Sequence, residues 1–181
     1  MHLGPNFWDT VTLTSVSSST FKELIHIPSL SYIQVCLIST GSGIPFISAL
    51  ELRPLINTTY VTKSGSLALT NRLDVASTSN QSYRYNYDVF DRLWIPFNKA
   101  AWTQLSTSLT VDGQNHNDYQ VPTVVMKTAS TPINANASMD FFWEPSDKTT
   151  QYYVYMHFAE LQQLKANHFR SFNITLNGAL M

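Results

Sequence analysis

The stretch Tyr32-Ile33-Gln34-Val35-Cys36-Leu37-Ile38 decides the fold class. It is almost continuously apolar, which is typical of a β-strand that is covered on both faces. The turn-forming sequence Gly41-Ser42-Gly43-Ile44-Pro45 follows it, and an extended pattern resumes over residues 46–53. Two strands on either side of a glycine-rich turn predict a β-hairpin.

Further strand signals lie outside this hairpin. Apolar residues dominate, or alternate with polar ones, over residues 21–27, 139–143, 152–158 and 172–176. A helical pattern is confined to residues 158–166, where Leu161 and Leu164 are three positions apart, and this segment is too short to define an architecture. Many short strands with Gly, Pro and Asn turns between them predict an all-β chain with little helix, arranged as β-sandwiches.

The two ends of the sequence are abrupt. Asn177-Gly178 is a strong hairpin signal, because both central positions of that turn need a positive φ. Only three residues follow it, so we expect the returning strand to be missing. The first ten residues have neither a basic start nor an apolar stretch, so we expect no signal peptide. We therefore expect the chain to be cut at both ends.

The composition favours the outside of a cell. Charged residues make up only 13% of the chain, and polarity is carried by 20 serines and 19 threonines, which suit sheets and turns. The eleven lysines and arginines are scattered, whereas a nucleic-acid partner needs clustered cations. No apolar stretch approaches the ~18 residues that a membrane span requires. These features exclude nucleic acid as a partner and predict no membrane span.

Residues 57–82 differ from their surroundings because they are rich in Ser, Thr and Asn, and an aromatic block follows them directly. This shift predicts a linker between two cores. The only cysteine, Cys36, lies within the apolar run and has two interpretations. It is a buried thiol that packs as a small apolar side chain, or it pairs with a cysteine beyond the ends of this chain.

No arrangement of residues predicts catalysis or a cofactor. Gly41-Ser42-Gly43 lacks the surroundings of a nucleophile elbow and of a dinucleotide loop. His157 with Glu160, and His116 with Asp118, lack the spacing of a zinc site. We therefore predict no enzyme activity, no metal and no cofactor.

Four Asn-X-Ser/Thr sequons are candidate glycosylation sites. They begin at Asn57, Asn80, Asn136 and Asn173. Asn173 falls in the polar phase of its predicted strand, between Phe172 and Ile174, which we expect to point inward.

Several long blocks, in order along the chain, carry a resemblance to a known family. They are residues 4–11, 34–37, 40–55, 83–94, 152–160 and 170–178. Together they resemble the malectin-like ectodomain of plant receptor-like kinases, especially those with leucine-rich repeats. The resemblance implies parts of two tandem, jelly-roll-like malectin-type β-sandwiches. Residues 1–60 would be the C-terminal part of the first sandwich, 61–67 a linker, and 68–181 the N-terminal part of the second.

This resemblance implies a fragment of a cell-surface receptor, on the extracellular face of the plasma membrane. Its partners would be a cell-wall carbohydrate or a secreted peptide, together with a possible co-receptor protein. The kinase domain of the parent family is absent from this sequence, so no catalysis is expected. A structural spacer that contacts only protein, without binding sugar, is the alternative.

Animal malectin binds a glucose disaccharide through aromatic residues and an aspartate. The comparable cluster here is Tyr83, Tyr85, Tyr87, Asp88 and Phe90. Aromatic faces suit sugars, because ring C–H groups stack on them. The alternation of the tyrosines equally predicts packing within a sheet, so both interpretations stay open.

The family's usual Arg-x-Asp-x-Gly turn is altered in this chain. The corresponding residues are Arg72-Leu73-Asp74-Val75-Ala76, in which alanine replaces the glycine. We expect this replacement to change the turn.

Overall fold

The computed structural model describes residues 1–111, 118–145 and 147–181. Its regular structure is all β apart from the four-residue helix α1 (Thr123–Met126), which confirms the predicted fold class. The strands are short: β1 (His2–Leu3), β2 (Asn6–Phe7), β3 (Leu24–His26), β4 (Val35–Cys36), β5 (Ser66–Ala68), β6 (Leu73–Val75), β7 (Ile95–Phe97), β8 (Trp102–Ser106), β9 (Thr128–Pro132), β10 (Thr175–Leu176) and β11 (Ala179–Leu180).

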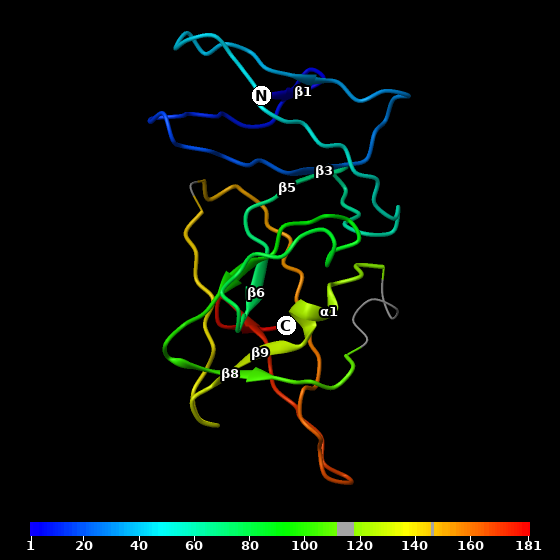
Figure 1. Ribbon diagram of the computed structural model, residues 1–181, viewed down its shortest axis with the longest axis vertical. Helices are drawn as coiled ribbons and strands as arrows, with labels where there is room; N and C mark the ends of the chain where they lie inside the picture. The colour runs from blue at the N-terminus through cyan, green and yellow to red at the C-terminus, as the bar shows by residue number, and fades with distance from the viewer. Residues whose placement is uncertain (112–117, 146) are drawn as a thin grey trace.

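These strands form small, separate sheets. β1 pairs with both β2 and β4, β3 pairs with β5, β8 with β9, and β10 with β11, all antiparallel. β6 and β7 pair in parallel. Figure 1 shows the residues before β5 at one end of the molecule and β6, β8, β9 and α1 at the other.

The hairpin predicted from residues 32–38 and 46–53 is wrong. Only Val35 and Cys36 of the first segment form a strand, and the register pairs Cys36 with His2 of β1 instead. Residues 46–53 contain no strand, and their apolar side chains stay exposed, as shown by Leu52 at 77%. The edge of β4 is taken by a strand that is distant in sequence, so the local turn does not determine the pairing. Cys36 is half-buried and free.

Two aromatic segments that were predicted as strands have no regular structure. Residues 139–143 and 152–158 lie in extended loops, where their rings contact other aromatic side chains. Phe141 packs against Trp102 with ring centroids 5.0 Å apart, and Tyr155 packs against Tyr60 at 5.2 Å. These ring contacts replace the backbone pairing that alternation predicted.

The helix and the C-terminal hairpin also differ from expectation. Residues 158–166 contain no helix, whereas α1 begins after Pro122, whose carbonyl accepts from the amides of Val125 and Met126. Asn177 and Gly178 have φ values of 51° and 81°, as the predicted turn requires. The returning strand that we expected to be missing is present as β11, paired with β10.

The core is small and the surface is large. Trp94, Val121 and Val125 are buried together, and Tyr83 and Tyr119 pack against them. The chain exposes 13961 Å², whereas a compact folded monomer of this mass exposes about 9,000 Å². Many apolar side chains are therefore in contact with water.

Residues before and after the predicted linker are joined by β3 and β5. The register pairs Ile25 with Leu67, and a mostly buried ion pair joins Glu23 to Arg72 close by. The division of the chain at residues 61–67 stays a prediction. Among the described residues, no helix has the length and apolarity that a membrane crossing needs.

Candidate functional site

The segment from Tyr83 to Trp94 carries the aromatic residues that were predicted to bind a ligand. Its two ends are held by an antiparallel bridge, in which the backbone amides of Tyr83 and Trp94 each donate to the other residue's carbonyl, at 3.0 and 2.8 Å. Between them the chain forms tight turns, with the amide of Asp91 donating to the carbonyl of Asp88 at 2.9 Å. The strand that the alternation of Tyr83, Tyr85 and Tyr87 predicted is therefore wrong, because this segment is a hairpin made of turns.

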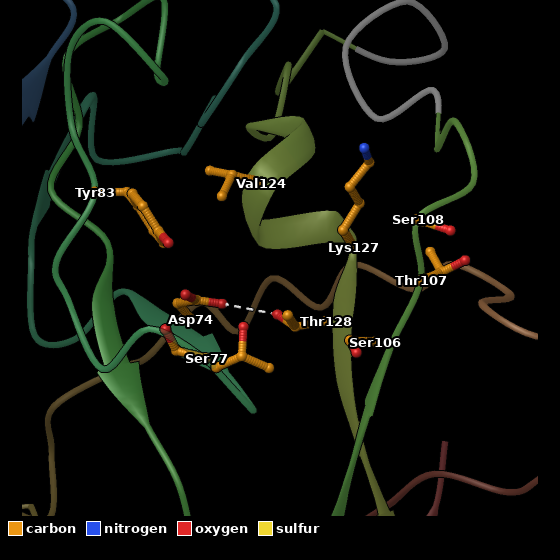
Figure 2. A pocket seen from close by; sticks show the side chains of 10 residues that line it. Asp74, Ser77, Tyr83, Ser106, Thr107, Ser108, Val124, Lys127 and Thr128 are labelled. Atoms are coloured by element: carbon orange, nitrogen blue, oxygen red, sulfur yellow. Dashed lines mark hydrogen bonds between the residues drawn. The ribbon is translucent and has the colours of Figure 1, made fainter.

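Tyr83 lies at the base of this hairpin and is half-buried. Its ring packs against the core around Trp94, and its hydroxyl hydrogen-bonds to Ser79 at 2.8 Å. The same side chain forms one wall of a pocket of about 400 Å³, as Figure 2 shows. Tyr83 therefore packs against the core and also lines a surface pocket.

Tyr85 and Tyr87 are the solvent-facing members of the predicted cluster. Tyr85 is 70% exposed and Tyr87 is 53% exposed. The Tyr87 ring meets the Tyr83 ring edge to face, with centroids 5.1 Å apart. Phe90 is half-buried, and the guanidinium of Arg92 lies over its ring at 5.2 Å. The structure thus brings Tyr83 and Tyr87 together and gives Phe90 a packing role.

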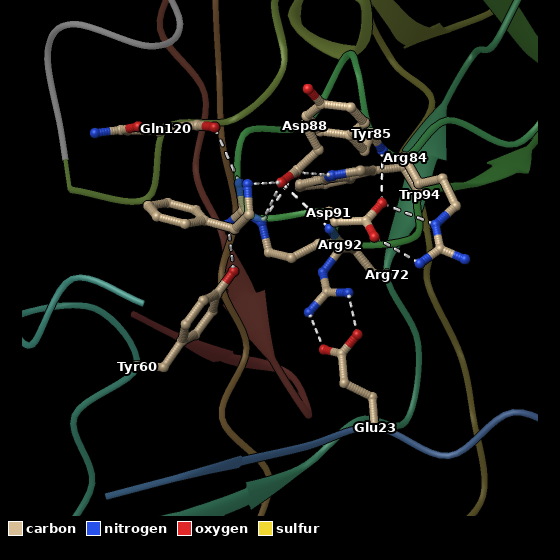
Figure 3. Close-up of polar contacts among 11 residues, drawn as sticks. Glu23, Tyr60, Arg72, Arg84, Tyr85, Asp88, Asp91, Arg92, Trp94 and Gln120 are labelled. Atoms are coloured by element: carbon tan, nitrogen blue, oxygen red, sulfur yellow. Dashed lines mark hydrogen bonds and ion pairs between the residues drawn. The ribbon is translucent and has the colours of Figure 1, made fainter. Parts of the chain in front are cut away.

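Asp88 is fully buried and makes its contacts inside the protein (Figure 3). Its Oδ2 accepts from the indole N–H of Trp94 at 2.6 Å and from Nε of Arg92 at 2.9 Å, and its Oδ1 accepts from the amide of Phe90 at 2.8 Å. Arg92 also donates to the hydroxyl of Tyr60 and to the carbonyl of Gln120. Both oxygens of the Asp88 carboxylate accept hydrogen bonds within this network, so Asp88 anchors the hairpin to the core.

A second polar cluster, on the solvent side of the hairpin, also holds it in place. Arg84 makes two hydrogen bonds to Asp91, at 2.9 and 2.7 Å, and Arg53 contacts the same carboxylate at 2.8 Å. Arg84 also reaches Glu51 at 3.0 Å. These cations lower the pKa of Asp91 to about 2, with the hydrogen bonds from Arg84 as the main cause.

This ionic cluster holds the backbone of Tyr85. The Tyr85 amide donates to Oδ1 of Asp91 at 2.8 Å, although its ring projects into solvent. A ring that is exposed but held by a fixed backbone loses little freedom when a ligand packs on it.

A second pocket, of about 290 Å³, lies at the C-terminal end of β7, whereas the hairpin joins its N-terminal end. Phe97, Phe141 and Trp143 line it, together with Lys99. The amine of Lys99 lies 4.7 Å from the ring centre of Trp102. Most residues that line this pocket are aromatic, whereas most residues that line the pocket beside Tyr83 are serines and threonines.

The histidine pairs considered for metal binding receive no support. Burial lowers the pKa of His157, with Arg92 as a further cause, and its ring packs against Tyr119. His116 lies outside the described residues. Within residues 1–111, 118–145 and 147–181, no group of three or more His, Cys, Asp or Glu side chains could hold a metal ion.

All four sequon asparagines, Asn57, Asn80, Asn136 and Asn173, are exposed. The reason given for Asn173 is partly wrong, because its neighbour Phe172 is 59% exposed and packs on Phe158 instead of pointing into a core.

Comparison with known proteins places these features in a family. The malectin-like domain family matches the chain over residues 1–181. The LRR receptor-like serine/threonine-protein kinase IOS1 of Arabidopsis thaliana is 50% identical over 177 residues, which cover 98% of this chain and 20% of that kinase. The probable LRR receptor-like serine/threonine-protein kinase MEE39, from the same plant, is 48% identical over 178 residues, with the same coverage. No solved structure gives a significant match.

The chain thus spans about a fifth of the length of the curated relatives it matches. The family match accounts for all 181 residues, so they include no kinase domain.

Proposed function

The chain belongs to the malectin-like family, as part of a receptor-like kinase ectodomain, and from this premise we propose that it recognises a cell-wall carbohydrate through Tyr85 and Tyr87. The observation that supports this proposal most directly is the exposure of both rings on a hairpin whose backbone is fixed. Sugar rings present C–H groups that pack on aromatic faces, and the edges of tyrosine rings supply hydroxyls for hydrogen bonding.

The contacts of the hairpin divide the predicted cluster into two roles. Tyr85 and Tyr87 would touch the ligand, because they are the exposed members. Asp88 and Phe90 would act indirectly, since Asp88 holds Arg92 and Trp94, and Arg92 covers the Phe90 ring. Tyr83 would support the Tyr87 ring from the side.

This recognition would take place outside the cell, at the plasma membrane, with a co-receptor protein as a further partner. In a chain directed through the secretory pathway, Asn173 and at least one of Asn57, Asn80 and Asn136 would carry a glycan, because all four are exposed. Intact mass before and after treatment with a deglycosidase measures this, and an unchanged mass would reject it.

The proposal is tested by measuring binding of neutral oligosaccharides, namely maltotriose, cellotriose and xylotriose, to the whole chain by calorimetry. Tyr85→Ala and Tyr87→Ala should each weaken the binding about fivefold or more, as expected for a lost contact of about 1 kcal/mol. Tyr32→Ala is the matched control, because Tyr32 is 62% exposed and belongs to the other end of the chain.

Two results would change the proposed ligand or the location of its site. If none of the three oligosaccharides binds, the role of a spacer that contacts only protein replaces carbohydrate recognition. If they bind equally to the wild type and to both tyrosine variants, carbohydrate recognition stands and the site lies elsewhere.

A secreted peptide is the second candidate ligand, and the aromatic pocket near β7 favours it. Phe97, Phe141 and Trp143 would accept an apolar side chain, with Lys99 beside it. Phe141→Ala should then weaken capture of secreted peptides and leave oligosaccharide binding unchanged.

A further inference from the structure

The turn between β10 and β11 carries an Asn-Gly pair on the surface. Asn177 and Gly178 are both exposed, and Asn177 is the only one of the thirteen asparagines in the chain that precedes a glycine. Where a Cβ of residue 178 would stand, the space is open, with no heavy atom within 4 Å apart from the chain neighbours. The turn therefore places a side-chain amide directly before a backbone nitrogen that no side chain shields.

The contacts around this pair are few. Neither the backbone amide of Gly178 nor the side-chain amide of Asn177 has a hydrogen-bond partner among the described residues. The strands β10 and β11 pair only with each other, through two residue pairs whose side chains are all exposed. A lone two-stranded hairpin is marginally stable in water, so this turn opens readily.

Other asparagines are held by the structure. The Asn98 side chain donates from Nδ2 to the carbonyl of Ser77 at 3.1 Å, and its Oδ1 accepts from Gln104 at 2.8 Å. After Asn136, the next backbone amide, that of Ala137, donates to a turn carbonyl at 3.2 Å. Groups held in this way reach the geometry of attack only after local opening. Asn177 has no such restraint.

We propose that Asn177 is a site of spontaneous deamidation, a covalent modification that converts it to aspartate and isoaspartate. Base removes the proton of the Gly178 amide, and the nitrogen attacks Cγ of Asn177. The new N–Cγ bond forms while the bond from Cγ to Nδ2 breaks, and ammonia leaves with a proton from water. The product is a five-membered succinimide ring.

Water then opens this ring at one of two bonds. Rupture of the bond between Cγ and the Gly178 nitrogen gives aspartate, whereas rupture of the original peptide bond gives isoaspartate, whose chain continues through Cγ. The steps need only water and base, without an enzyme or an oxidant. This inference goes beyond ligand recognition and does not depend on it.

The modification would loosen the hairpin. Either product adds a negative charge, and isoaspartate also inserts a methylene group into the backbone of a two-residue turn. Because loop length fixes the register of a hairpin, the pairing of Leu176 with Ala179 should be lost. The hydrogen bond from the Met181 amide to the Ile174 carbonyl, of 3.0 Å, should be lost with it.

Mass spectrometry of the aged chain tests the site directly. Trypsin cuts after Arg170, so the peptide 171–181 contains both Asn177 and Asn173. After incubation of the whole chain, fragmentation should place a gain of about 1 Da on Asn177. Asn173 is the internal control and should stay unchanged, because the β-branched Ile174 crowds the attacking nitrogen. The rate should increase in proportion to the hydroxide concentration.

Two variants separate the effect of the neighbouring residue from that of the structure. Gly178→Ile should slow the conversion about tenfold or more, because the branched side chain crowds the nitrogen. Lys99→Gly places a glycine after Asn98, whose side chain is held at both ends. In the folded chain Asn98 should then convert at least tenfold more slowly than Asn177, and in urea the two rates should become similar.

The proposal is overturned if Asn177 stays unmodified in the chain while it converts in a synthetic peptide of residues 171–181. It is also overturned if Gly178→Ile converts as fast as the wild type, which decides the question even if Lys99→Gly does not fold. Equal rates at Asn98 and Asn177 in folded Lys99→Gly would show that the structure does not select the site. Hydrogen exchange at the Met181 amide should be faster in the isoaspartate form, and equal exchange would reject the loosening of the hairpin.

Discussion

Trp94 donates its indole N–H to Oδ2 of Asp88 at 2.6 Å, and both side chains are buried. The same oxygen accepts from Nε of Arg92, so one carboxylate holds both the core tryptophan and the guanidinium that lies over its ring at 5.4 Å. The hairpin that displays Tyr85 and Tyr87 is thus anchored by the buried carboxylate of Asp88. Its shape depends on this network together with the backbone bridge between Tyr83 and Trp94.

Removal of the Asp88 carboxylate should open the hairpin. Asp88→Ala leaves the Arg92 guanidinium buried without its counter-charge, which costs about 3 kcal/mol or more. Cleavage of the folded chain by a protease should then accelerate about a hundredfold, because it follows the population of the open form. Asp140→Ala should change the rate less than twofold. Equal rates in the wild type and Asp88→Ala would show that the network does not hold the hairpin.

The Glu23–Arg72 pair should stabilise the contact between β3 and β5. Two hydrogen bonds of 2.6 and 3.1 Å join these mostly buried side chains, which are 49 positions apart. Glu23→Gln should cost about 2 kcal/mol, as for other hydrogen bonds to charged groups. Hydrogen exchange at the Leu69 amide, which donates to the Glu23 carbonyl, should accelerate about thirtyfold.

Glu160→Gln is the matched control for this change. Glu160 pairs with Arg170 in the same bidentate way, but both side chains are at least one-third exposed. Exposed pairs contribute little to stability, so exchange at Leu69 should be unchanged. A similar effect of both variants would show that burial does not strengthen the Glu23–Arg72 pair.

The Asp91 carboxyl should titrate at about pH 2. Because this pKa is depressed in the folded state, the stabilisation is present above the unfolded value near 3.9 and is lost as the pH falls towards 2. Carboxyl ¹³C shifts measured by NMR should give this midpoint. In Arg84→Ala the midpoint should rise by about one unit, and in Arg84→Lys by less. A midpoint near 3.9 in the wild type would contradict the ionic cluster.

The isolated chain should associate with copies of itself. Its apolar exposure is concentrated in segments without strand partners, such as Ile44 at 90% and Phe46 at 71%. Exposed apolar patches of this extent favour association. Sedimentation should show a mass that increases with concentration, and Phe46→Ser should reduce the increase. A monomer with one cooperative, reversible melting transition would contradict this prediction.

The sequence predicted some local features of the fold but missed others, such as the loops at residues 139–143 and 152–158. The Asn177-Gly178 turn follows from backbone sterics alone, and it forms with both φ values positive. Strand partners could not be predicted, because Cys36 pairs with His2 through contacts that no local pattern encodes. Ala76 takes a φ of 66°, in the left-handed region that favours glycine, at the position where the resemblance implies glycine.

The candidate site was predicted only in part, for a physical reason. Aromatic enrichment identified the segment that holds Tyr85 and Tyr87, but period-two alternation assumed a strand where the backbone makes turns. The sequence carried only a weak sign that Asp88 has a structural role, namely an arginine, Arg92, four positions later as a possible ion-pair partner. The hydrogen bond from Thr128 to Asp74 had no such signal, because the two residues are 54 positions apart.

The contrast between Tyr83 and Tyr85 should separate packing from ligand binding. Tyr85→Ala removes a ring that is 70% exposed, so the free energy of unfolding should change by less than about 0.5 kcal/mol. Oligosaccharide affinity should fall about fivefold, and Tyr85→Phe should retain most of it because the stacking face remains. Tyr83→Ala removes a ring that packs on Trp94 and should cost about 2 to 3 kcal/mol, below the ~3–5 kcal/mol of a fully buried aromatic. Urea denaturation and calorimetry on the same samples measure both quantities. If Tyr85→Ala destabilises the chain as much as Tyr83→Ala and leaves affinity unchanged, Tyr85 is a packing residue and the ligand site lies elsewhere.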